Sequence, residues 1–291
     1  MLLHIPVKSH RQKQPTIAKK HFSFLKCFFF VSKAWQSAAV LLANLLLSSA
    51  MASGTCWSLE QHLAKVDEWS TVAKIIDGDT IHLQDGRKVR IIGINTPEVG
   101  RDGEASQPFA LQAHKALRKL LEDNKKIALT YDQDKRDRYK RLLAYVTLAD
   151  GRSVEQALLA QGLAYSIVVP PNARHINCYR EIERNARKAR LGLWQLPENQ
   201  LLEAHDLSSK STGYRLLSGT VSAYSESKKS IYLKLTAKLS IRVSKKDQQY
   251  FPSVQLKSLV GKKILTRGRV NRYKGRQSIH VRSTHDIKHI Q

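Results

Sequence analysis

IIDGDTIHL, residues 75–83, consists of two apolar runs separated by a polar Asp-Gly-Asp. Glycine tolerates a positive φ and aspartate can accept a hydrogen bond from its own backbone, so Asp77-Gly78-Asp79 predicts a tight turn between two antiparallel strands. A turn by itself accounts for both aspartates. Whether either of them also carries chemistry depends on the polar residues that follow in the sequence.

Strand-like and helical runs surround this turn, from residue 70 to residue 194. Apolar-rich runs predict strands at 70–77, 80–84, 87–94, 125–132 and 141–148. Apolar residues at helical spacing predict helices at 108–123, 152–162 and 178–194. Five short strands with interleaved helices indicate a mainly β fold with helices (α+β), and a small barrel rather than a parallel sheet.

Three polar clusters stand out on this predicted framework. The first is the turn with Asp77 and Asp79, the second is Arg90 with Asn95-Thr96-Pro97-Glu98, and the third is Arg138, Tyr139 and Arg141 within DRYKRLLAY. Taken singly, each has an ordinary interpretation as an outward strand residue, a loop charge or a solvated turn.

Together and in this order, the clusters resemble the staphylococcal nuclease (thermonuclease) family. The family's pattern of strand, D-G-D-T, strand, R-x-x-x-x-D-T-P-E and D-K-Y-G-R-x-L-A-Y is met here as IIDGDTIHL, VRIIGINTPE and DRYKRLLAY. Similarity continues through VEQALLAQGLA and Pro170-Pro171-Asn172 to the closing GLW at 192–194, so that it covers about residues 70–196. The resemblance implies an OB-like five-stranded barrel that cleaves phosphodiester bonds in DNA and RNA and binds calcium.

The resemblance also assigns roles to individual residues. It implies metal binding by oxygens of Asp79, Asn95 and Thr96. These motifs contain no cysteine and a single histidine, His82, which is too few such ligands to suggest a zinc site. Glu98 matches the residue that orients or deprotonates the attacking water. Arg90 and Arg141 match two arginines that hold phosphoryl oxygens bidentately. Substrate contacts are implied for the neighbours of Arg141, namely Arg138, Tyr139 and Lys140.

Several positions depart from the family's pattern. Asn95 stands where the family has its second metal-binding aspartate, which removes one negative charge from the site and predicts weaker calcium binding. Lys140 replaces a glycine, and Val168-Val169 stand where the family has tyrosines, which puts base stacking in doubt. The loop after Glu98 is short, which predicts a more open cleft.

The amino-terminal region has the features of an export signal. Residues 1–52 contain seven basic and no acidic side chains, and the apolar run SAAVLLANLLLSS precedes Ala50-Met51-Ala52. This pattern predicts a signal peptide and a secreted or periplasmic protein, with an uncleaved membrane anchor as the alternative. Export favours a disulfide between Cys56 and Cys178, with two free thiols as the alternative.

Charge divides the rest of the chain into two parts. Residues 53–212 contain 24 basic and 21 acidic side chains, a net of +3, whereas residues 213–291 contain 18 basic and three acidic ones, a net of +15. With the polar segment before residue 214, this break predicts an arm at 53–69, a nuclease-like domain at 70–200, a linker at 201–213 and a basic domain at 214–291.

The basic domain is predicted to be a second small barrel. Strand-like runs separated by the turns at 225–229 and 273–275, with a short helix within 245–259, favour an OB-fold, and an SH3-like barrel is the alternative. Cations interleaved with an aromatic residue predict a surface that binds a nucleic-acid backbone, formed by Arg267, Arg269, Arg272, Tyr273, Lys274 and Arg276. A merely solubilising surface is the alternative, although such surfaces usually mix both signs of charge. The spacing of His280, His285 and His289 fits no common metal site.

These features predict an exported, calcium-dependent (Ca²⁺) endonuclease that acts on DNA, RNA or both. The alternative is a nucleic-acid-binding protein that has lost catalysis through Asn95. A cell-surface protein that binds anionic envelope polymers is a third possibility, because the net charge of +25 favours any polyanion. No stable protein partner is predicted, and a membrane partner is expected only if the leader stays uncleaved.

Overall fold

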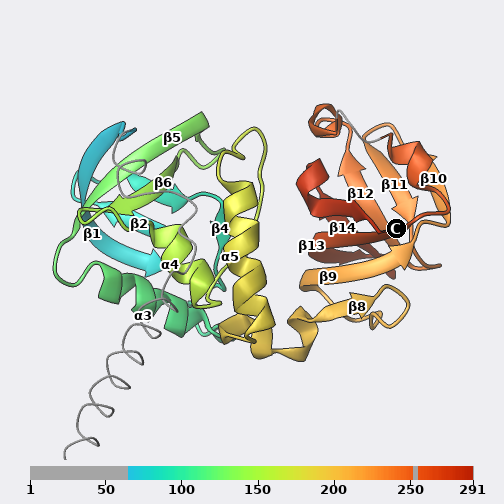
Figure 1. Cartoon of the computed structure of the whole chain (residues 1–291), viewed down its shortest axis with the longest axis horizontal. Coiled ribbons are helices and arrows are strands. Elements are labelled where there is room, and N and C mark those ends of the chain that lie inside the picture. The colour runs from blue at the N-terminus through green and yellow to red at the C-terminus, as the bar shows by residue number, and fades with distance from the viewer. Residues whose placement is uncertain (1–64, 252–254, 291) are drawn as a thin grey trace, which may run out of the picture. The chain divides into compact units, whose positions relative to one another are not determined.

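The computed structural model describes residues 65–251 and 255–290 (Figure 1). The predicted signal or anchor at 1–52, most of the arm at 53–69 and Cys56 lie outside the described residues. Cys178 is disulfide-bonded, which rules out a free thiol at that position, while its pairing with Cys56 stays a prediction. Within the described ranges, no helix is both long and apolar enough to cross a membrane.

Five strands form the closed barrel that the sequence predicts, in the order β1-β2-β3-β6-β5. Neighbouring strands are antiparallel except for β3 and β6, which pair in parallel. The strands are β1 (Glu68–Asp77), β2 (Thr80–Leu83), β3 (Lys88–Ile91), β5 (Lys126–Arg136) and β6 (Leu142–Leu148). Alternate side chains fill the interior, because Ile81, Val89, Ile91, Ile127 and Leu129 are completely buried.

Three helices cover the barrel: α3 (Ala110–Leu120), α4 (Val154–Ala160) and α5 (Ile176–Lys188). Helix α3 packs against β1 and α4, and α4 packs against β6 and α5 (Figure 1). Two further strands of two residues each, β4 (Ile94–Asn95) and β7 (Tyr165–Ser166), pair with each other outside the barrel. This small pair matters for the site because β4 carries Asn95.

The third helix is shorter than the predicted span of 178–194. It ends at Lys188, and Arg190 then takes a positive φ of 51°. A Cβ at Gly192 would lie 2.4 Å from the Gly162 carbonyl oxygen, so the chain turns where only glycine fits. A 3-10 turn, η1 (Gly192–Gln195), then buries Trp194 completely.

Residues after 200 form a second sheet with the strand order β10-β11-β12-β14-β13-β9-β8, and β15 also pairs with β13. The strands are β8 (Leu201–Glu203), β9 (Gly213–Thr220), β10 (Ala223–Glu226), β11 (Ser230–Lys234), β12 (Leu239–Ser244), β13 (Lys263–Tyr273), β14 (Arg276–Val281) and β15 (Ile287–His289). Strand β8 lies in the predicted linker but pairs in parallel with β9, so these residues belong to the sheet. The predicted helix is replaced by two short 3-10 turns, η3 (Gln248–Tyr250) and η4 (Leu256–Leu259); a third, η5 (Thr284–Asp286), precedes β15.

The second sheet repeats the strand order of the first barrel. Only two residues separate β9 from β10, so these two can be counted as one long strand. Numbered along the chain, this strand and β11, β12, β13 and β14 then lie in the order one, two, three, five, four, as the five strands of the first barrel do. Strands β12 and β14 provide the parallel pair, as β3 and β6 do in the first barrel. This order fits the predicted OB-like arrangement, whereas closure of a second barrel stays a prediction.

Candidate active site

The polar turn between β1 and β2 holds Asp79 in the interior, with 3% of its surface exposed. Asp77 Oδ1 accepts a hydrogen bond from the Asp79 backbone N–H at 3.1 Å, as expected for an aspartate that stabilises a turn. The reason predicted for the glycine is wrong, because Gly78 does not have a positive φ. Glycine is needed for space, since a Cβ there would lie 2.7 Å from Thr96 Cγ2 and 2.8 Å from Ala113 Cβ. This close approach lets the Thr96 backbone N–H donate to Asp79 Oδ2 at 2.8 Å.

Arg90 on β3 is held by four acceptors. Its Nη2 lies 3.0 Å from Asp79 Oδ2 and donates to Asn95 Oδ1, also at 3.0 Å. Its Nη1 donates to the Ile94 carbonyl at 3.0 Å and to the Ile91 carbonyl. Two backbone carbonyls therefore fix one guanidinium nitrogen, and the other bridges two of the predicted metal-binding residues.

The electrostatics of the turn depend on burial and on this arginine. Burial, together with the neighbouring Asp77, raises the pKa of Asp79 to about 6, although the charge of Arg90 and the Thr96 N–H act in the opposite direction. A cation at this carboxylate would favour its ionised form, because an opposite charge lowers a carboxyl pKa.

The predicted metal ligands offer oxygen atoms only, which suits a hard cation such as calcium. Four of these oxygens are already hydrogen-bonded. Asp79 Oδ1 accepts from Thr80 Oγ1 and Asp79 Oδ2 accepts from the Thr96 N–H, while Asn95 Oδ1 accepts from Arg90 and the Thr96 carbonyl accepts from Asn95 Nδ2 at 3.1 Å. The residues therefore fit calcium in the type of donor, while the charge is lower than that of a site with two aspartates. Among residues 65–251 and 255–290, no group of three or more His, Cys, Asp and Glu side chains is placed to hold a metal ion.

Arg141 is oriented by Asp137, which the sequence prediction did not include. Asp137 Oδ2 accepts a hydrogen bond from Arg141 Nε and forms an ion pair with Arg141 Nη2, each at 2.8 Å. Asp137 Oδ1 accepts the backbone N–H groups of Tyr139 and Arg141 at 2.9 and 3.0 Å. Burial acts to raise the pKa of Asp137, but its hydrogen bonds with Arg141 outweigh burial and lower it. The four-residue spacing within DRYKR was the sequence signal for this pair.

Lys140 stands where the family's pattern has a glycine, and its backbone takes a left-handed conformation that glycine adopts without strain. Its φ is 65°, in the left-handed region that costs a residue with a Cβ about 1–2 kcal/mol. We expect Lys140→Gly to raise the free energy of unfolding by about 1 kcal/mol, because relief of strain exceeds the added entropy of the unfolded chain. Urea unfolding followed by circular dichroism measures the change. Lys140→Ala is the matched control and should give no gain; equal stability of the two variants would contradict this explanation.

One cavity of about 380 Å³ brings most of the predicted residues together. Its wall includes the predicted residues Asp79, Arg90, Asn95, Glu98 and Arg141. Glu98 is exposed and carried on a loop that Gln107 fixes in two places: the Glu98 N–H donates to Gln107 Oε1 at 3.1 Å, and the Gln107 N–H donates to the Glu98 carbonyl at 3.0 Å. Of the predicted residues, the cavity therefore combines two guanidinium groups, an accessible carboxylate and a buried carboxylate.

Other predicted residues lie outside this cavity. Thr96 does not line it and acts on Asp79 through its backbone, while its own buried Oγ1 has no hydrogen-bond partner among the residues that the structure describes. Arg138, Tyr139 and Lys140 form an exposed ridge beside Arg141, where Tyr139 is 64% exposed and Arg138 lies over its ring at 4.7 Å. The cavity wall also contains residues that were not predicted: Asp134, Asp137, Pro170 and Asn172. Asn172 holds the wall in place by exchanging two hydrogen bonds of 2.8 Å with the Asp134 backbone.

An OB-like barrel that directs two arginines and a carboxylate into one cavity is the arrangement expected in a protein of the nuclease class, because guanidinium groups can hold the oxygens of a phosphate ester. Residues 88–196 match the family described as "Staphylococcal nuclease homologue". The chain is 39% identical over 129 residues to "Endonuclease YncB" of Bacillus subtilis (strain 168). The aligned residues make up 43% of this chain and 60% of that protein. The chain is also 35% identical over 127 residues to "Thermonuclease" of Staphylococcus intermedius. These aligned residues make up 43% of this chain and 74% of that protein. The chain belongs to the staphylococcal nuclease family, and the predicted membership of a nuclease family is confirmed.

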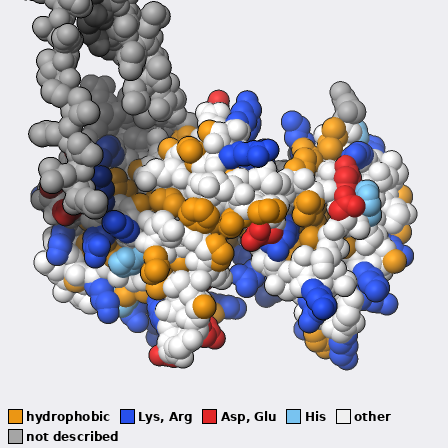
Figure 2. Space-filling model, turned by 90° about the horizontal axis from the view of Figure 1, so that it is seen from below, with side chains coloured by type: hydrophobic (Ala, Val, Ile, Leu, Met, Phe, Trp, Pro, Cys, Tyr) orange, Lys and Arg blue, Asp and Glu red, His pale blue; other side chains and the backbone are white. Residues whose placement is uncertain are grey.

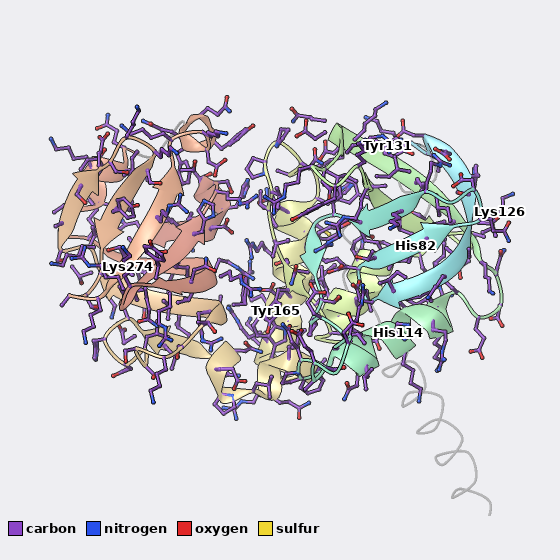
Figure 3. All side chains as sticks on the ribbon, turned by 180° about the vertical axis from the view of Figure 1, so that it is seen from behind. His82, His114, Lys126, Tyr131, Tyr165 and Lys274 are labelled. Carbon is purple, nitrogen blue, oxygen red and sulfur yellow. The ribbon has the colours of Figure 1, made fainter. Side chains whose placement is uncertain are left out.

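The predicted cationic surface of the second domain is only partly exposed. Arg269, Arg272, Tyr273, Lys274 and Arg276 are exposed at the β13-β14 hairpin, where Tyr273 is 74% exposed (Lys274 is labelled in Figure 3). Lys and Arg side chains are also spread widely over the face shown in Figure 2.

Arg267 does not belong to this exposed surface, and its predicted role in nucleic-acid binding stays a prediction. Its guanidinium Nη2 lies 2.7 Å from Glu183 Oε2 of α5, and the two side chains are only 12% and 1% exposed. A buried guanidinium committed to a buried carboxylate cannot bind a phosphate without leaving that carboxylate unpaired.

Proposed function

We propose that this protein is a calcium-dependent endonuclease that hydrolyses phosphodiester bonds in DNA, RNA or both, with little dependence on base sequence. The observation that carries the proposal is the shared cavity of Arg90, Glu98 and Arg141 beside Asp79. The relatives named above, an endonuclease and a thermonuclease, support it.

Each cavity residue has a task in this reaction. Arg90 and Arg141 donate to the nonbridging phosphoryl oxygens, where charge accumulates as the bond breaks. Asp137 holds Arg141 by Nε and Nη2, which leaves Nη1 uncommitted among the described residues. Glu98 is exposed and accepts a proton from the attacking water. Asp79, Asn95 and Thr96 would hold calcium, which would add positive charge at the phosphate and lower the pKa of a bound water.

A digestion assay with calcium titrated into the millimolar range tests this proposal. Supercoiled plasmid and a structureless RNA serve as separate substrates, and a chelator provides the calcium-free baseline. We expect cleavage that rises with calcium and falls to the baseline in Arg141→Ala. Cleavage no greater than that of Arg141→Ala at any calcium concentration would contradict the proposal.

Asn95→Asp tests the calcium site separately. The change restores a carboxylate beside Asp79, and we expect the calcium concentration for half-maximal cleavage to fall by about tenfold, because ligand charge is a main control of calcium affinity. Asn124→Asp is the matched control: it adds the same charge at an exposed position outside the cavity. Equal midpoints in the unchanged protein and both variants would contradict a metal site at Asn95.

We further propose that the protein is exported and that the exposed cations of the second domain hold the polymer. Export rests on the sequence of residues 1–52. The second domain is tested with the triple variant Arg272→Gln/Lys274→Gln/Arg276→Gln. A plot of the logarithm of the single-strand binding constant against the logarithm of the salt concentration should become shallower by about 2 in this variant, because each lost phosphate contact removes about 0.7 from the slope. Fluorescence anisotropy between 50 and 200 mM salt measures the slope, and an unchanged slope would contradict a role for this hairpin.

A further inference from the structure

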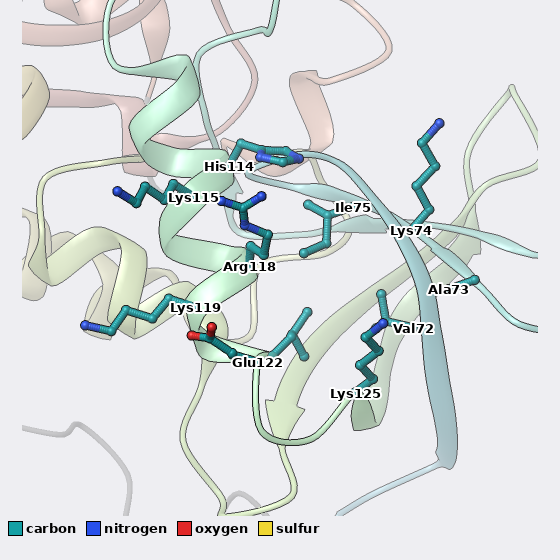
Figure 4. A pocket seen from close by; sticks show the side chains of 11 residues that line it. Val72, Ala73, Lys74, Ile75, His114, Lys115, Arg118, Lys119, Glu122 and Lys125 are labelled. Carbon is teal, nitrogen blue, oxygen red and sulfur yellow. The ribbon is translucent and has the colours of Figure 1, made fainter.

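A second and larger cavity lies on the nuclease barrel, between β1 and α3 (Figure 4). Its volume is about 540 Å³, compared with about 380 Å³ for the candidate active site. Val72, Ile75 and Leu121 give it an apolar floor. Figure 4 shows His114 and Arg118 extending from α3 toward Ile75 of β1, so that helix and strand form opposite walls. We call this cavity the β1-α3 groove.

Positive charge is concentrated along the β1-α3 groove, although residues 53–212 have a net charge of only +3. Five cations line it, with one acidic side chain, Glu122. The cations are Lys74, Lys115, Arg118, Lys119 and Lys125. All five are exposed, and none of them belongs to an ion pair within the described ranges.

Local structural needs explain only some of these charges. Arg118 and Lys119 lie in the last turn of α3, where cations interact favourably with the helix dipole. Lys74 on β1 and Lys125 in the segment after the helix have no such role. Some other arginines of the same domain are paired with acidic partners, as Arg87 is with Glu68 and Arg152 is with Asp150. The groove thus keeps its cations available to an external anion.

A line of cations joins the groove to the active-site cavity. Lys74 on β1 pairs with His82 on β2, and His82 pairs with Lys88 on β3, which places all three side by side across the sheet (His82 and His114 are labelled in Figure 3). Burial and then the positive charges of Lys88, Lys74 and Arg101 lower the pKa of His82. Arg101 Nη2 in turn lies 3.9 Å from Asp77 Oδ2, at the wall of the active-site cavity.

We propose that the β1-α3 groove binds the phosphate backbone of a nucleic-acid strand whose neighbouring segment occupies the active site. Cations spread along two walls suit a chain of phosphates better than one small anion, which would need donors converging on a point. The apolar floor offers contact to sugar and base surfaces. This inference rests on the proposed nuclease function and extends it to a second contact region on the same strand.

The test measures binding without cleavage, using the full-length protein and a chelator to remove calcium. The groove variant is Lys74→Gln/Arg118→Gln/Lys125→Gln, and the control variant is Arg184→Gln/Lys188→Gln/Lys210→Gln. The control removes three exposed cations outside the groove, including Lys188 in the last turn of α5. The probe is a fluorescent single-stranded oligonucleotide of about 24 nucleotides, titrated between 50 and 200 mM salt.

We expect the salt slope to become shallower by about 2 in the groove variant and to change little in the control variant. A second measurement compares cleavage of the long oligonucleotide with cleavage of a dinucleotide: KM should rise only for the long substrate, with kcat unchanged for both. Equal slopes for the two variants, or no binding of the oligonucleotide by the unchanged protein, would overturn the groove proposal. A shallower slope in a protein that cleaves neither substrate would support the groove and contradict the proposed nuclease activity.

Discussion

Arg267→Met is expected to lower the free energy of unfolding by about 3 to 5 kcal/mol, because it leaves a buried carboxylate without its cation. Glu183 is 1% exposed and accepts from Arg267 Nη2 at 2.7 Å and from the Ser166 backbone N–H and Oγ at 2.6 Å each. Burial acts to raise the pKa of Glu183, yet Arg267 outweighs burial and lowers it, with help from Arg180. The carboxylate is therefore charged in the folded protein and depends on this partner.

A double-mutant cycle separates the ion pair from other effects of losing Arg267. Glu183→Gln keeps an oxygen for the Ser166 N–H but removes the charge, so the double variant should lose much less stability than the two single changes added together. Arg269→Met is the matched control, since Arg269 is exposed on the same strand and should change stability by less than about 0.5 kcal/mol. Urea unfolding measures all four variants. A loss below about 1 kcal/mol for Arg267→Met would show that the charge is not buried as described.

The same ion pair connects the second domain to the candidate active site. Ser166, which Glu183 holds, pairs with Ile94 in the short β4-β7 ladder, and Asn95 follows Ile94 directly. Arg180 adds a second connection, since it donates to the Ser166 carbonyl at 2.8 Å and to Asp286 of the second domain at 2.6 Å. Loss of Arg267 is thus expected to displace Asn95 as well as to lower stability.

The sequence predicts the first barrel well because its information is local. Alternating apolar residues define the strands, and the Asp-Gly-Asp turn and the NTPE loop lie directly beside them. The five residues that share the active-site cavity could therefore be predicted from motifs on neighbouring elements of one small barrel. The requirement for Gly78 could not be explained in the same way, because it depends on Thr96 and Ala113, which are distant in the sequence.

Long-range pairing explains what the sequence did not reveal. Arg267 belongs to a cationic run, and only the position of Glu183, 84 residues earlier, removes it from the exposed surface. The β1-α3 groove has the opposite cause: Lys74 and Lys125 each resemble ordinary solvated charges, and the fold places them around one cavity. Charge counts over a segment describe neither arrangement, because both depend on which elements pack together.

Arg90→Lys is expected to lower kcat/KM by nearly as much as Arg90→Ala, about 10²- to 10³-fold, if the proposed nuclease mechanism is correct. The guanidinium contacts the Ile91 and Ile94 carbonyls with one nitrogen, and Asp79 and Asn95 with the other. An ammonium group has a single nitrogen and cannot meet both sets of acceptors, whereas the guanidinium meets them with Nη1 and Nη2 and keeps its Nε–H for a phosphate oxygen. Retained charge without retained geometry should therefore restore little activity.

The measurement is steady-state cleavage of a fluorogenic oligonucleotide at saturating calcium. The temperature is kept well below the melting temperatures of all variants, because loss of Arg90 also leaves Asp79 without its closest cation and should lower stability. Arg152→Lys and Arg152→Ala are the controls: Arg152 is an exposed arginine paired with Asp150 outside the cavity, and both changes should alter kcat/KM by less than about twofold. If Arg90→Lys kept more than a tenth of the activity while Arg90→Ala lost it, charge alone would account for the effect. The role of guanidinium geometry inferred from the four acceptors would then be wrong, even though the enzyme would still be a nuclease.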